Sequence, residues 1–194
     1  MRFCSKCGHQ VSLSIPEGDA RERFVCTSCA TIHYENPRNV VGTIPVWKDK
    51  VLLCKRAIYP RLGFWTLPAG FLEVGESTAT GAIRETLEEA GAQVEIGPLF
   101  SLLNVIHAEQ VHLFYLAQLK EPIFSPGIES LEVGLFSESE IPWDDLAFPT
   151  ITKTLEWYFS DKQAGVIHFG DSSFATHLDD IPYDERIDKK HHSS

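Results

Sequence analysis

The hydrophobic and polar positions of the chain predict a series of short strands and two helices. Runs rich in β-branched and aromatic residues, bounded by Gly, Pro or charged turns, are typical of strands. Apolar residues spaced three and four apart are typical of helices that pack by one face. The predicted strands cover residues 40–47, 51–56, 64–69, most of 93–107 and of 110–119, and 131–136, with 166–169 as a further candidate. Residues 48–50 are expected to form the polar turn of a hairpin, and another turn is expected near 108–109. The predicted helices cover 78–90 and 149–159.

The helix predicted over residues 78–90 has signals at both ends. Ser77 and Thr78 each carry an oxygen that can accept the free backbone N–H groups at a helix start, and Gly91 is suited to the position just after a helix end. The apolar stripe consists of Ala79, Ala82, Ile83 and Leu87. We expect this helix to pack by the stripe and to present its acidic residues on another face.

Three of those acidic residues are neighbours on the helix surface. Glu85, Glu88 and Glu89 stand at positions i, i+3 and i+4, which face the same side. Like charges this close raise each other's pKa unless a cation lies among them, and oxygen ligands suit a hard ion such as Mg²⁺ or Mn²⁺. A solvated acidic face is the alternative interpretation.

A longer pattern of fixed spacing favours the metal interpretation. It reads G-x5-E-x7-R-E-x-x-E-E-x-G and consists of Gly70, Glu76, Arg84, Glu85, Glu88, Glu89 and Gly91. This stretch, residues 70–91, here called the box, resembles the signature of the Nudix hydrolases, which cleave nucleoside diphosphates linked to another group X. The family usually has bulky aliphatic residues where this chain has Thr86 and Ala92. Both are packing positions, so the departure concerns how the helix packs.

The resemblance implies an α/β fold, a Nudix α/β/α sandwich with a mixed sheet. It implies that catalytic Mg²⁺ (or Mn²⁺) is held by the carboxylates of Glu85, Glu88 and Glu89 and by the Gly70 carbonyl. The catalytic residues that it implies are Glu88, Glu89, Arg84 and Glu76. Guanidinium stays protonated, so Arg84 cannot be a base. The resemblance implies instead that Arg84 pairs with a box glutamate, with Glu76 as the partner or as an outer-shell ligand. The general base stays open between a box glutamate and two later ones, Glu129 and Glu132.

Four of the five cysteines form two close pairs, CSKC and CTSC, which are Cys4, Cys7, Cys26 and Cys29. Without a signal peptide this spacing predicts a structural Zn²⁺ site in a zinc ribbon, over two disulfides or a redox pair. Residues 1–33 are too few to bury a core alone, and zinc would supply on the order of 10 kcal/mol of folding free energy or more. We favour a structural or dimer-forming role. Cys54 lies in an apolar run and is expected to be a buried thiol.

Length and charge bound the domains and the partners. We expect a zinc ribbon over residues 1–33, a linker over 34–38, a Nudix domain over 39–160 and a partly mobile extension over 161–194. The net charge of −10 argues against binding of a nucleic-acid backbone. The sequence has no apolar run of membrane-spanning length and no secretory signal, so we expect a cytoplasmic protein with no membrane partner.

The order of motifs narrows the substrate. A four-cysteine ribbon, then HYENPR, then the Nudix pattern resembles a group that includes ADP-ribose and FAD pyrophosphatases. This resemblance implies a small nucleotide-diphosphate substrate, AMP and a phosphorylated product, and a homodimer. NADH pyrophosphatases carry a Ser-Gln-Pro-Trp-Pro-Phe-Pro run where this chain has SLLNVIHAEQ, so NADH is an alternative, as is a non-catalytic nucleotide sensor. Phe64 and Trp65 are candidates for stacking on the adenine, with core packing as the competing interpretation.

Overall fold

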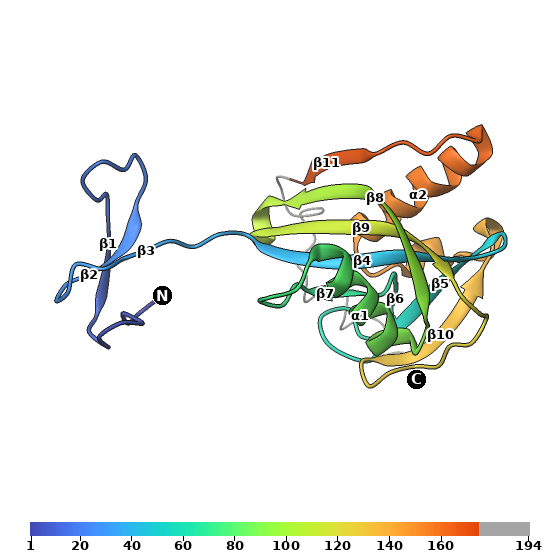
Figure 1. Cartoon of the computed structure of the whole chain (residues 1–194), viewed down its shortest axis with the longest axis horizontal. Helices are drawn as coiled ribbons and strands as arrows, with labels where there is room; N and C mark the ends of the chain where they lie inside the picture. The colour runs from blue at the N-terminus through green and yellow to red at the C-terminus, as the bar shows by residue number, and fades with distance from the viewer. Residues whose placement is uncertain (175–194) are drawn as a thin grey trace, which may run out of the picture. The chain divides into compact units, whose positions relative to one another are not determined.

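The computed structural model describes residues 1–174. The chain divides into two compact units, with the boundary between Pro37 and Arg38 (Figure 1). The part of the predicted mobile extension beyond residue 174 lies outside the described residues. None of the helices described is long and apolar enough to cross a membrane.

The first unit, Met1–Pro37, is a small antiparallel sheet with two cysteine-bearing turns. Its strands follow the order β1 (Val11–Ser14), β2 (Arg23–Cys26) and β3 (Ile32–His33). Gly8 has a φ of 75° directly after Cys7, a left-handed conformation that glycine adopts without steric cost. The backbone can therefore turn sharply after the first cysteine pair.

The second unit is organised around a mixed sheet. The strand order is β10 (Ser130–Phe136), β5 (Lys50–Arg56), β4 (Arg38–Trp47), β9 (Gln110–Leu119), β8 (Val94–Val105) and β11 (Gly170–Phe174). Two short strands lie off this path: β6 (Trp65–Thr66) pairs with β5, and β7 (Ala69–Phe71) pairs with β4. The β4–β9 and β8–β11 pairs are parallel and the others antiparallel.

Two helices, α1 (Thr78–Ala90) and α2 (Pro149–Ala164), cover opposite faces of this sheet (Figure 1). On β4, Thr43 contacts Thr86 of α1, whereas the next residue, Ile44, belongs to the hydrophobic core that includes Leu155 of α2. Successive side chains of a strand point to opposite faces, so the helices lie on the two sides. The predicted α/β/α sandwich with a mixed sheet is thus confirmed.

Short 3₁₀ turns complete the connections. They are η1 (Ile106–Ala108), η2 (Glu138–Glu140) and η3 (Trp143–Asp145). The first of them joins β8 to β9, where the sequence predicted a turn, and the other two lie in the segment between β10 and α2.

Two predicted strands differ from the structure. The strand expected over residues 64–69 is broken into β6 and β7, because Pro68 has no N–H for a ladder and its carbonyl accepts a bond from Thr43 N instead. The candidate strand at residues 166–169 is not formed, since β11 begins only at Gly170. In that segment the amides of Val166 and His168 are bound to Asp161 at the end of α2.

Candidate functional site

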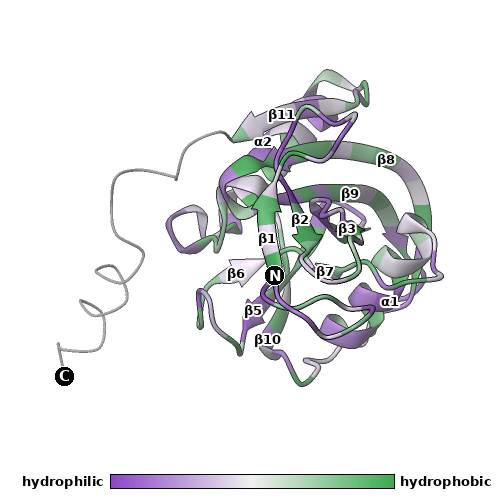
Figure 2. Cartoon of the chain, turned by 90° about the vertical axis from the view of Figure 1, so that its left-hand side faces the viewer, coloured by the Kyte–Doolittle hydropathy of each residue, from purple (hydrophilic) through white to green (hydrophobic). Residues whose placement is uncertain are grey.

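Helix α1 lies where the sequence placed it, but it does not keep its acidic and packing faces apart. Ser77 is the N-cap, accepting from Thr80 N, and Gly91 ends the helix with a φ of 59°. Glu85 and Glu89 are buried, whereas Leu87 of the expected apolar stripe is 51% exposed. Figure 2 shows that α1 carries both hydrophilic and hydrophobic residues. The carboxylates therefore face the sheet and its adjoining loops, and the separation of faces expected from the sequence is wrong.

The two departures from the usual Nudix pattern are accommodated by packing. The Thr86 and Thr43 hydroxyl oxygens lie 2.6 Å apart, and Thr86 also donates to the Ala82 carbonyl. A buried hydroxyl needs such partners. Ala92 is 1% exposed and belongs to a core formed mainly with β5 and β9. The helix is thus fixed to β4 by a buried polar contact.

The backbone at the start of β7 lies directly against the two buried carboxylates. Ala69 N donates to Glu89 Oε2 at 3.0 Å. A Cβ added at Gly70 would overlap the carboxyl group of Glu85. Only glycine allows the backbone to come this close, which explains why the box opens on Gly70.

Burial sets the ionisation of these two acids. The pKa of Glu89 is raised to about 8, chiefly by desolvation; the Ala69 amide and Arg56 oppose this rise, and the charges of Glu85 and Glu129 contribute to it. Desolvation also raises the pKa of Glu85, against the lowering effect of Arg84. Two adjoining buried acids that resist ionisation would be stabilised as anions by a cation, so they fit a divalent metal.

Arg84 connects most of the box by hydrogen bonds. Its Nη2 and Nε atoms donate to the Glu76 carboxylate at 2.7 and 3.1 Å. Its Nη1 bridges Glu85 and Glu88, at 2.7 and 3.1 Å, and Nη2 also reaches the Phe71 carbonyl. The expected pair of Arg84 with Glu76 is present, and it holds the pKa of Glu76 below its usual range.

Replacing Arg84 by lysine tests this network. Lysine keeps the charge but loses the planar fork that binds two carboxylates at once. We expect about 1.5–3 kcal/mol less stability in urea unfolding and a fall in kcat of roughly 10- to 100-fold, because Glu85 and Glu88 lose their orientation. Arg21→Lys, at an exposed position, should change neither quantity. Equal stability and kcat in both variants would contradict the positioning role.

Of the two later glutamates, only Glu129 lies near the box. Glu129 is the last residue of a loop, residues 121–129, and its charge is one of the causes, after burial, that raise the pKa of Glu85 and Glu89. Glu132 instead forms an exposed ion pair with Lys55 at 3.7 Å. The structure thus separates two residues that the sequence left equivalent.

The sequence pattern did not single out Arg56, which ends β5 beside the box. Its charge lowers the pKa of Glu89, after the larger effects of burial, Ala69 and Glu85. Its guanidinium lies 5.2 Å from the ring centroid of Phe148, and Nε donates to the Pro60 carbonyl. A basic residue at the end of a strand that leads towards the glycine turn is the only signal that the sequence offers for it.

The two aromatic candidates for substrate contact differ in burial. Trp65 is 9% exposed and packs edge-on against Phe136, with 4.8 Å between ring centroids. Phe64 is partly exposed, and the Arg61 guanidinium lies 5.2 Å from its ring centroid. Phe64 is therefore the more exposed of the two rings.

The four paired cysteines of the first unit converge on one point. Their Sγ atoms all lie within 4.8 Å of one another, with 3.4 Å between Cys7 and both Cys26 and Cys29, and 3.7 Å between Cys4 and Cys29. A disulfide would need about 2.05 Å, whereas tetrahedral Zn–S bonds of about 2.3 Å place sulfur atoms about 3.8 Å apart. The four thiols fit zinc.

Within residues 1–174, these cysteines are the only group of three or more ligand atoms that lie so close together. The box carboxylates are not gathered to that extent, since Arg84 engages Glu85 and Glu88. Cys54 is buried, as expected, and burial raises the pKa of its thiol.

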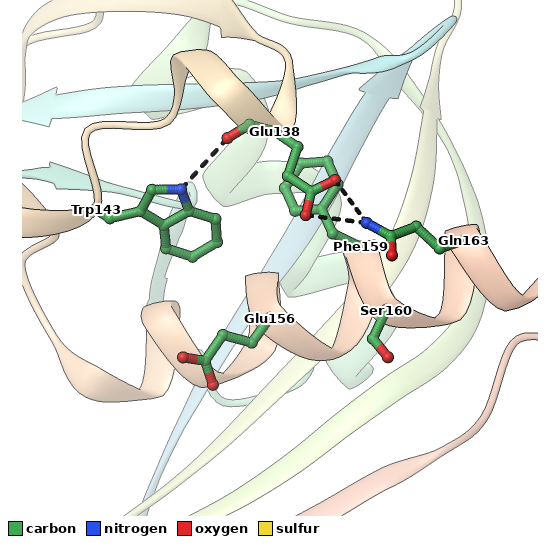
Figure 3. A pocket seen from close by; sticks show the side chains of 6 residues that line it. All are labelled: Glu138, Trp143, Glu156, Phe159, Ser160 and Gln163. Atoms are coloured by element: carbon green, nitrogen blue, oxygen red, sulfur yellow. Dashed lines mark hydrogen bonds between the residues drawn. The ribbon is translucent and has the colours of Figure 1, made fainter.

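A cavity of about 310 Å³ lies beside α2 (Figure 3). The residues that line it come from the segment 138–163, which follows the box in the sequence. Gln163 Nε2 donates to both carboxylate oxygens of Glu138, and Trp143 Nε1 donates to the Glu138 carbonyl. The polar groups of Glu138, Trp143 and Gln163 thus already bind one another, and the cavity is lined by none of the predicted site residues.

Comparisons with known proteins found relatives of this chain. A curated relative, the NAD-capped RNA hydrolase NudC of Photobacterium profundum, is 27% identical over 141 residues, 72% of this chain and 51% of its own length. A mitochondrial NAD(P)H pyrophosphatase of Mus musculus is 33% identical over 94 residues, 48% of this chain and 25% of its own length. The chain thus spans at most about half the length of these two relatives.

Solved structures and family models cover more of the chain. The crystal structure of a NUDIX hydrolase from Nitrosomonas europaea has a TM-score of 0.87 and 52% identity, covering 90% of this chain and 99% of that one. The model of the Nudix N-terminal zinc ribbon matches residues 2–35, and the NUDIX domain model matches residues 36–158, more than half of the chain. The chain therefore belongs to the NUDIX family and carries the family's N-terminal zinc ribbon.

Proposed function

We propose that this protein is a Mg²⁺-dependent hydrolase of a nucleoside diphosphate derivative, with ADP-ribose or FAD as substrate. The observation that carries the proposal is the pair of buried carboxylates, Glu85 and Glu89, held against the backbone of Ala69 and Gly70. Water would add to one phosphorus while the bridging oxygen leaves with the other, giving AMP and, from ADP-ribose, ribose 5-phosphate.

The chain's own residues provide the ligands and their orientation. Glu85, Glu88 and Glu89, with the Gly70 carbonyl, would hold the cation. When bound, the cation supplies the positive charge that offsets the two phosphoryl groups. Arg84 fixes Glu85 through its Nη1 contact, and Glu76 in turn fixes Arg84. Arg56 adds a second cation near Glu89.

We assign the general base to Glu129. A general base must be able to reach the attacking water, and Glu129 is exposed while lying within electrostatic reach of Glu85 and Glu89. Glu88 and Glu89 then remain ligands. Glu132, paired with Lys55 on β10, has no part in the reaction.

The Glu129→Gln variant should separate these roles. We expect kcat to fall roughly 10²- to 10⁴-fold, with KM nearly unchanged, because the amide accepts no proton but keeps its size. Glu132→Gln is the matched control and should retain wild-type kcat. Steady-state kinetics on both variants decide the assignment: a loss in Glu132→Gln alone would reverse it.

A second candidate substrate is NADH or an NAD-capped RNA. Its support is the printed activity of the relatives, an NAD-capped RNA hydrolase and an NAD(P)H pyrophosphatase. Against it, the chain has SLLNVIHAEQ where NADH pyrophosphatases carry their proline-rich run. Phe64 is the ring that we propose for stacking on the adenine, which all these substrates share.

A substrate panel tests the proposal. The zinc-loaded protein is incubated with Mg²⁺ and ADP-ribose, FAD, NADH, ADP-glucose, a diadenosine polyphosphate or NAD-capped RNA, and products are separated by ion-pair chromatography. We expect the highest kcat/KM for ADP-ribose or FAD, with AMP as product. Preference for NADH or capped RNA would favour the second candidate, and tight binding without turnover would indicate a sensor.

We further propose that Zn²⁺ in the ribbon is structural and that the protein is a homodimer. The four converging thiols support the first statement. Light scattering at micromolar concentration tests the second, with a monomer mass of 21.8 kDa as the contradicting result.

A further inference from the structure

The loop of residues 121–129 is bound to the C-terminal turn of α1 by its backbone. Ser125 N donates to the Ala90 carbonyl at 2.8 Å, and Gly127 N donates to the Glu89 carbonyl at 3.0 Å. Carbonyls in the last turn of a helix have no intrahelical partner. Both carbonyls lie at the end of α1 that carries the box glutamates, so these two bonds fix the position of the loop relative to those glutamates.

This close approach of the loop to α1 depends on the absence of a side chain at residue 127. A Cβ on Gly127 would overlap the carbonyl oxygen of Glu88 and come within 2.9 Å of its carbonyl carbon. These are backbone atoms of α1, which cannot rotate away as the end of a side chain could. Gly127 is not among the residues with positive φ, so a larger residue is excluded by space rather than by conformation.

The far end of the loop is fixed as well. The Glu129 carbonyl accepts from Ala57 N at 2.8 Å, and Ser130 N donates to the Gly127 carbonyl at 3.1 Å. Ser130 is paired with Arg56 across β10 and β5. Glu129 is therefore held between the end of β5 and the end of α1, only two residues from the close approach at Gly127.

We propose that Gly127 is a positioning residue for the reaction: its close contact with α1 sets the distance of Glu129 from Glu85 and Glu89. This inference rests on the proposed hydrolase function and on the assignment of Glu129 as base. Gly127 itself touches no substrate. It acts through the two-residue connection to Glu129.

The test is a double-mutant cycle on the full-length, zinc-loaded protein with ADP-ribose and Mg²⁺. Gly127→Ala should lower kcat about 10- to 100-fold and leave KM within a factor of about 2, since the base is displaced but the substrate contacts are not. Ile128→Ala, at a neighbouring side chain that is 98% exposed, is the control and should match wild type.

The decisive readout is additivity. If Gly127 acts only through Glu129, the Gly127→Ala/Glu129→Gln double variant should be no more than about 2-fold slower than Glu129→Gln alone. Losses that multiply would mean that Gly127 supports the fold of the site in general, and would overturn the proposal. Wild-type kcat in Gly127→Ala would overturn it too.

An insertion pair decides the matter even if Gly127→Ala fails to fold. One glycine inserted between Ile128 and Glu129 keeps the Gly127 contact but displaces the base, and should reduce kcat as Glu129→Gln does. One glycine inserted between Glu121 and Pro122, before the bonded part of the loop, should retain wild-type kcat. Equal rates in the two insertions overturn the positioning role, while a wild type without turnover on the panel would overturn the proposed function as well.

Discussion

Replacing Glu89 by glutamine is expected to lower kcat roughly 1000-fold at saturating Mg²⁺, which corresponds to the several kcal/mol of charge stabilisation that a bound metal supplies. The fold should remain at least as stable as the wild type. Glu89 is buried beside Glu85, and burial already raises its pKa to about 8. A neutral isostere removes the cost of placing a charge there. Steady-state kinetics and thermal unfolding of the same preparation measure both effects.

Glu121→Gln is the control for this experiment, because Glu121 is exposed at the start of the loop and should not affect kcat. A catalytic ligand whose loss leaves stability intact differs from a structural residue, whose loss lowers both. Wild-type kcat in Glu89→Gln with saturating Mg²⁺ would remove Glu89 from the metal site.

The Cys26→Ser variant should lose its zinc and unfold the first unit. Cys26 is 3% exposed and its Sγ lies 3.4 Å from that of Cys7. A unit of this size folds alone only with a metal or cross-links, and structural zinc contributes on the order of 10 kcal/mol or more. Zinc content should fall from about one to about zero per chain, and amides of residues 1–37 should lose hydrogen-exchange protection. The second unit should keep its protection, since it has its own core.

His9→Ala is the matched variant for this test, because His9 contacts the Cys7 carbonyl rather than a thiol and should retain zinc. Wild-type protein that contains no zinc, keeps its amides protected and shows no free thiols among the four cysteines after denaturation would indicate disulfides instead.

The sequence predicted the fold and the box because both depend on local, periodic signals. The bounds of α1 follow from Ser77, from Gly91 and from residue spacing, and the β4–β5 hairpin follows from the polar turn at residues 48–50. The spacing of the cysteines predicted their convergence in the same way.

The parts that could not be predicted depend on tertiary contacts. Periodicity placed Leu87 on the packing side of α1, but the site there needs Glu85 and Glu89 against β7, so Leu87 faces solvent. Glu129 and Glu132 have the same chemistry and nearly the same position in sequence. Only the capping of α1 by the loop and the pair of Glu132 with Lys55 distinguish them.

The most direct test of the metal-dependent reaction is the rate of AMP formation from ADP-ribose and from FAD as free Mg²⁺ is raised from zero. The protein is first desalted with its zinc retained, so that only the carboxylate site is titrated. We expect no AMP without Mg²⁺ and a saturable rise with it in the wild type, and no rise in Glu89→Gln. AMP formation at the same rate with and without Mg²⁺ would contradict the assignment of the box carboxylates as metal ligands.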